Sequence, residues 1–102
     1  MGINARIQSE TGDKIQELYD INNLVVKLLP SFNDESSICL RFIDPYGNTV
    51  FNQRQLPVFI IELKSAIAES TNLKAINHGD KLLKLAEKAD GKIHTYLKFI
   101  GD

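Results

Sequence analysis

The sequence predicts an α+β domain in which an antiparallel-rich sheet has helices packed on one face. Some stretches alternate apolar and polar residues with a period of two, and others carry apolar residues at helical spacing. The two kinds of stretch are interspersed along the chain, which gives the predicted element order β-β-α-β-β-α-α-β. Because the chain has 102 residues, we expect one domain that covers residues 1–102.

The first elements are predicted to be a hairpin over residues 3–19. Its turn falls at residues 11–13, where Gly12 can adopt a positive φ. Ile15 and Leu18 are out of phase for simple alternation, which indicates a β-bulge or an edge strand with few buried positions.

A helix is predicted to follow this hairpin. Asp20 is its candidate N-cap, and apolar residues recur at helical spacing over residues 21–29. Pro30 is expected to end the helix at about Leu28, because a residue that precedes proline avoids the α region.

A second hairpin, over residues 37–51, is predicted to form the middle of the sheet. Residues 38–43 alternate like a strand with one buried face, and residues 49–51 are good strand formers. Between them, Asp44-Pro45-Tyr46-Gly47 fits a type I turn.

The second half of the chain is predicted to contain two helices and a closing strand. The first helix begins at Pro57 and runs to Glu69. Residues 70–79 are expected to form a polar connector, with room for a short turn of helix around residues 73–76. Asp80 is the candidate N-cap of the second helix, which Gly91 ends before a strand over residues 92–100.

Composition narrows the class of protein. The net charge of −1 argues against nucleic-acid binding through phosphate neutralisation. No apolar run is long enough to span a bilayer or resembles a signal peptide, and the single Cys39 excludes an internal disulfide. We therefore expect a soluble cytoplasmic protein without membrane association.

The sequence contains no pattern that identifies a catalytic, cofactor-binding or metal site. His78 and His94 lack the spacing of metal ligands, and both are expected to be structural or solvent-facing. Cys39 is expected to pack in the core or in the sheet, and the alternative is a pair with His94 on a neighbouring strand.

Two surfaces are candidate interaction sites. If residues 38–43 and 95–100 form adjacent strands, one uncovered sheet face would carry Arg41, Ile43, Tyr96, Lys98 and Ile100. The hairpin tip would carry Asp44, Tyr46 and Asn48, unless Tyr46 folds back onto the sheet.

Two hypotheses follow for the function. The first is a non-enzymatic protein-interaction module that binds a protein partner or forms a homodimer, with an inhibitor or immunity-type role as one version. The second is a small-molecule-binding or catalytic domain whose pocket lies between sheet and helices and uses Arg41, Tyr96 and His94.

Two segments carry a resemblance to known proteins. The run from Leu40 to Phe51 and the closing run from His94 to Asp102 resemble small uncharacterised bacterial single-domain proteins of about this length. The resemblance covers most of the chain and implies a bacterial, stand-alone protein, but it implies no activity and no catalytic residue.

Overall fold

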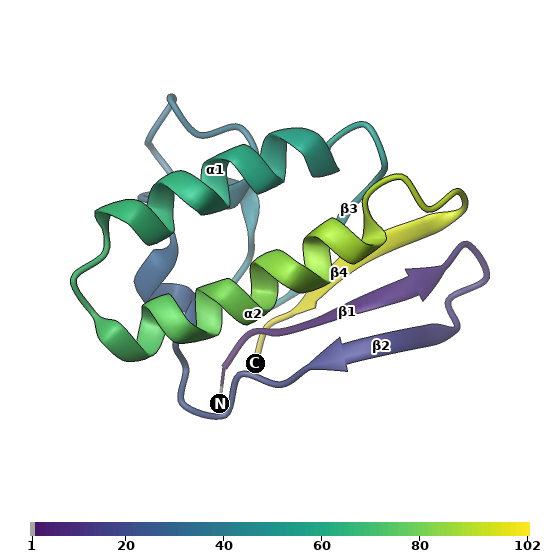
Figure 1. The fold of residues 1–102 in the computed structure, drawn as a ribbon, viewed down its shortest axis with the longest axis horizontal. Helices are drawn as coiled ribbons and strands as arrows, with labels where there is room; N and C mark the ends of the chain where they lie inside the picture. Colours follow the sequence, from purple (N-terminus) through teal and green to yellow (C-terminus); the bar gives the residue numbers. More distant parts are fainter. Residues whose placement is uncertain (1) are drawn as a thin grey trace.

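A four-stranded antiparallel sheet forms one layer of the protein, and two helices cover one of its faces (Figure 1). The computed structural model describes residues 2–102. In chain order the elements are β1 (Asn4–Ser9), β2 (Lys14–Leu18), the 3-10 helices η1 (Val25–Leu28) and η2 (Leu40–Phe42), β3 (Asn48–Phe51), α1 (Leu56–Glu69), α2 (Leu73–Ala89) and β4 (Thr95–Ile100). The strand order is β2-β1-β4-β3. The predicted α+β class is therefore confirmed.

The core lies between the sheet and the helices. Three phenylalanine rings from different elements meet there: Phe59 of α1 lies 5.2 Å from Phe51 of β3 and 5.5 Å from Phe99 of β4, measured between ring centroids. Each ring is at most 3% exposed. Since burying one such side chain contributes about 1.5–3 kcal/mol, this cluster is the main attachment of α1 to the sheet.

The first hairpin has the predicted form. β1 and β2 pair antiparallel, and Gly12 in their turn has a φ of +90°. The pairing register shifts between Ile7 and Gln8, so the predicted irregularity is a β-bulge.

The predicted central hairpin is wrong. Residues 38–43 form no strand; they contain η2 and an irregular segment, and β3 is an edge strand beside β4. The backbone N–H groups of Ile38, Cys39 and Leu40, which a strand would offer to a neighbour, donate instead to the carboxylate of Glu62 on α1. The turn is confirmed, since the Gly47 N–H donates to the Asp44 carbonyl over 3.4 Å, and so is the strand predicted for residues 49–51, which lie in β3.

The helix predicted after Asp20 is much shorter than expected. Asp20 does accept hydrogen bonds from the N–H groups of Leu24 and Val25, but only η1 follows. The residue before Leu24, Asn23, has a φ of +54°, which a right-handed helix does not allow.

Helix α1 begins as predicted, with Pro57 in its first turn, but α2 begins earlier than expected. Its N-cap is Asn72, whose side chain accepts a hydrogen bond from the Ala75 N–H over 3.0 Å. The connector predicted for residues 70–79 and the N-cap at Asp80 are therefore wrong. After α2, Gly91 has a φ of +82°, as predicted for a left-handed stop.

Candidate functional site

The uncovered face of the sheet carries three of the five predicted face residues. Tyr96, Lys98 and Ile100 alternate along β4 with residues that are buried under the helices. Across the ladder, Lys98 is paired with Arg6, and Tyr96 with Gln8. The atoms Arg6 Nε and Gln8 Oε1 are shielded from solvent and have no hydrogen-bond partner in the described chain. The side chains on this face therefore pack closely together.

Arg41 and Ile43 do not join this face, because their segment is not a strand. Both line a groove that we call the aromatic groove. Its other lining residues include Val26, Leu29, Pro30, Phe32, Phe42, Asp44 and Pro45. The structure thus divides the predicted face between the outer surface of β4 and this groove.

Two phenylalanines dominate the aromatic groove. Phe32 and Phe42 are 66% and 47% exposed, and their ring centroids lie 5.8 Å apart in an edge-on arrangement. Arg41 holds them in place: its Cζ lies 4.6 Å above the Phe42 ring, and its Nη1 donates a 3.2 Å hydrogen bond to the Phe32 carbonyl. Exposed aromatic rings that pack against each other in this way form an apolar surface.

The segment predicted as a hairpin tip is a turn over residues 44–47, and it lies beside the groove. Asp44 Oδ1 accepts a hydrogen bond from the Tyr46 N–H over 2.9 Å, and the Tyr46 side chain is 84% exposed. Tyr46 therefore does not fold back onto the sheet. Asn48, the third predicted tip residue, is exposed at the start of β3 opposite Ile100.

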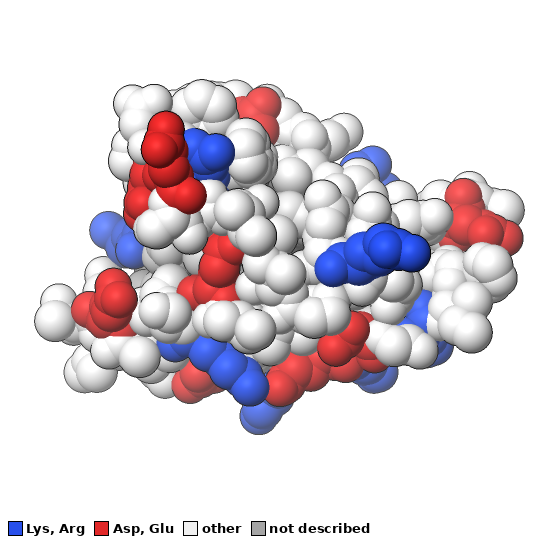
Figure 2. All heavy atoms as spheres, turned by 90° about the horizontal axis from the view of Figure 1, so that it is seen from above, with Lys and Arg blue, Asp and Glu red and all other residues white. Residues whose placement is uncertain are grey.

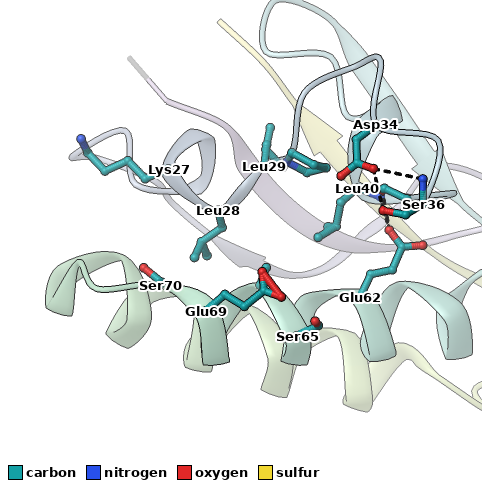
Figure 3. Close-up of a pocket in the computed structure, with 13 residues that line it drawn as sticks. Lys27, Leu28, Leu29, Asp34, Ser36, Leu40, Glu62, Ser65, Glu69 and Ser70 are labelled. Atoms are coloured by element: carbon teal, nitrogen blue, oxygen red, sulfur yellow. Dashed lines mark hydrogen bonds between the residues drawn. The ribbon is translucent and has the colours of Figure 1, made fainter.

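A polar pocket lies between α1 and the segment from Lys27 to Ser37 (Figure 3). Glu62 reaches from α1 into its wall and accepts hydrogen bonds from the Ser37 hydroxyl (2.6 Å) and from three backbone N–H groups. Burial alone would raise the pKa of Glu62, but these donors together hold it below its ordinary value. Nothing in the sequence pattern indicated this role of Glu62.

Cys39 is a buried free thiol close to Glu62. The thiol is buried beside α1, with Sγ 3.8 Å from the Gln55 carbonyl oxygen. Burial, and then the negative charge of Glu62, raise the pKa of Cys39 to about 11. No contact between Cys39 and His94 occurs in the described chain, so the conceivable Cys–His pair is not formed.

The three residues of the hypothetical pocket do not converge. His94 and Tyr96 line a shallow hollow with Arg54, whereas Arg41 lies in the aromatic groove. His94 Nδ1 lies 2.9 Å from Glu10 Oε2 on the surface. Residues 2–102 contain no group of three or more His, Cys, Asp or Glu side chains that could hold a metal ion.

His78 is not in a polar connector but in α2, where it is buried next to Asp20. Charged side chains are intermixed over the face seen in Figure 2, and neither sign gathers into a large patch there. This distribution agrees with the net charge of −1 and offers no broad basic face in that view.

Comparisons of the chain with protein-family models, with curated proteins and with solved structures found no significant match. The resemblance to small bacterial proteins therefore stays a prediction. Among residues 2–102, no helix is both long and apolar enough to cross a membrane.

Proposed function

We propose that the protein is a non-enzymatic protein-interaction module that forms a homodimer through the aromatic groove. The observation that carries this proposal is the exposed pair Phe32–Phe42, whose rings pack edge-on against each other. Soluble proteins seldom leave fixed aromatic rings in water without a use, and such patches commonly mark interfaces. Aromatic residues and arginine are also the residues that contribute most to binding energy at interfaces.

A second copy of the chain is the occupant that the groove fits best. A two-fold interface needs a projecting side chain and a hollow on one and the same surface. The projecting Tyr46 lies next to Pro45, which lines the groove. The groove also carries both charges needed for a reciprocal pair, with Arg41 of one copy opposite Asp44 of the other.

The alternative hypothesis of a small-molecule or catalytic pocket has less support, since Arg41 lies apart from the hollow that His94 and Tyr96 line. We also infer that the protein acts in the cytoplasm, because its one cysteine, Cys39, is a buried free thiol.

The test is the solution mass by light scattering over a hundredfold range of concentration. We expect a mass twice that of the 11.5 kDa chain, and a monomer for Phe42→Ser. The matched control is Ile61→Ser, which removes an exposed apolar side chain of α1 outside the groove. A monomeric wild type overturns the homodimer, as does equal dissociation of both variants. An inhibitor or immunity-type role would require the monomer.

A further inference from the structure

A second hollow lies between α2 and the segment that follows β2. One wall consists of Lys74, Asn77, His78 and Lys81, which share a face of α2, and the other of Tyr19, Ile21, Asn22 and Leu24. The hollow has a volume of about 410 Å³, which is within the range of small-molecule sites. It shares no lining residue with the aromatic groove, so its use is independent of self-association.

His78 is the unusual residue of this hollow. Its side chain is only 10% exposed, and its imidazole forms no hydrogen bond with any of residues 2–102. The nearest charged atom, Asp20 Oδ1, lies 3.8 Å from Nε2, which is too long for a hydrogen bond. The imidazole nitrogens are not shielded from solvent, so His78 can bond to whatever fills the hollow that it borders.

The Asp20 carboxylate is held in an orientation that gives His78 no hydrogen bond. Its side chain is fully buried and accepts hydrogen bonds from the backbone N–H groups of Ile3 (3.0 Å), Leu24 (2.6 Å) and Val25 (3.1 Å). These three bonds fix the carboxylate in place and offset its charge. The hollow is therefore where His78 can find a hydrogen-bond partner.

The charge of the hollow's rim favours an anion. Lys74 and Lys81 lie four residues before and three residues after His78, so both are its neighbours on the helix surface. Neither lysine forms an ion pair within the described chain, and no acidic residue lines the hollow. Opposite them, the half-exposed ring of Tyr19 offers a flat surface for stacking.

We propose that this hollow binds a small organic phosphate of the nucleoside monophosphate type. Lys74 and Lys81 flank the phosphate, the imidazole of His78 donates a hydrogen bond to it, and the Tyr19 ring stacks on the base. Binding is non-covalent and requires no metal ion. The amide groups of Asn22 and Asn77 complete the polar lining.

The experiment is a calorimetric titration of the full chain with AMP, with adenosine and inorganic phosphate as separate probes at constant ionic strength. We expect saturable AMP binding that is at least tenfold tighter than binding of either probe. Lys74→Gln and Lys81→Gln should each weaken AMP binding about tenfold, as loss of one charge-assisted hydrogen bond implies. The matched control is Lys84→Gln, an exposed α2 lysine outside the hollow.

A second readout reports on His78 directly. AMP should shift the ring nitrogen resonances of His78 and leave those of the surface residue His94 unchanged. Absence of saturable AMP binding overturns the proposal, as does adenosine or inorganic phosphate binding as tightly as AMP. Equal weakening by Lys84→Gln and Lys81→Gln would show only non-specific attraction and also overturns it.

Discussion

Replacing Glu62 by glutamine should release the segment that carries the aromatic groove. The Glu62 carboxylate accepts hydrogen bonds from the Ser37 hydroxyl and from the backbone N–H groups of Ile38, Cys39 and Leu40. These four donors lie more than 20 residues before Glu62 in the chain, at separations of 22 to 25 residues. No other side chain of the described residues accepts a hydrogen bond from these three backbone N–H groups.

The size of the destabilisation depends on which N–H groups lose their hydrogen-bond acceptor when glutamine replaces Glu62. The amide keeps one oxygen, which can still accept from Ser37, Cys39 and Leu40, but its NH₂ group faces the N–H group of Ile38. The Ile38 N–H is exposed and can bond to water, so the loss comes mainly from replacing a charged acceptor, which is roughly twice as strong as a neutral one. We therefore expect Glu62→Gln to lower the free energy of unfolding by about 1–3 kcal/mol.

The assay is urea denaturation, followed by the same comparison at several pH values. Glu69→Gln is the matched control, because Glu69 is an exposed α1 carboxylate without a hydrogen bond in the described chain. The pKa of Glu62 is held below the ordinary 4.5, so its contribution is complete above pH 4.5 and is lost as the pH falls through the folded-state pKa. The difference between wild type and Glu62→Gln should therefore shrink in acid.

Two results would refute this reasoning. One is a destabilisation by Glu62→Gln that is no larger than that of Glu69→Gln. The other is a destabilisation that stays constant from neutral pH to pH 3, since a protonated Glu62 should no longer differ from glutamine in charge.

Three further predictions concern other buried groups. Asp20→Asn should cost about 2–4 kcal/mol in urea denaturation, because three backbone N–H groups lose a charged acceptor, whereas the exposed control Asp80→Asn should change little. Gly79→Ala should lower the melting temperature despite better helix propensity, because the added Cβ would lie 2.9 Å from Leu28 Cδ1; a higher melting temperature would contradict this. At pH 8 the shift of the Cys39 pKa from 9.0 to about 11 should slow thiol labelling about a hundredfold relative to the urea-unfolded chain, and equal rates would contradict it.

The elements that could be predicted are those specified by their own residues. The alternation in β1 and β4, and Gly12 in the first turn, act locally. Pro57 likewise needs no distant partner to favour the start of α1. Tyr96, Lys98 and Ile100 could be placed on one face for the same reason, since alternation alone sets the face of a strand.

The elements that were missed depend on contacts between distant residues. Residues 38–43 alternate as a strand would, but the N–H groups of residues 38–40 donate to Glu62 on α1, which no local pattern reveals. The start of α2 was missed because His78 and Gly79 look polar and flexible, although both are buried against other elements. The aromatic groove could not be predicted, because an irregular segment brings its residues together.

A charge reversal tests the proposed homodimer most directly. Arg41→Glu and Asp44→Lys should each weaken self-association, because a reciprocal pair then becomes two like-charge contacts. In a two-fold dimer the double variant carries both reversed charges and restores both contacts. The account predicts that light scattering finds monomers for each single variant and a dimer weaker than the wild type for the folded double variant, since the Arg41 contacts with Phe32 and Phe42 are not restored. A double variant that associates no more strongly than either single variant would contradict it.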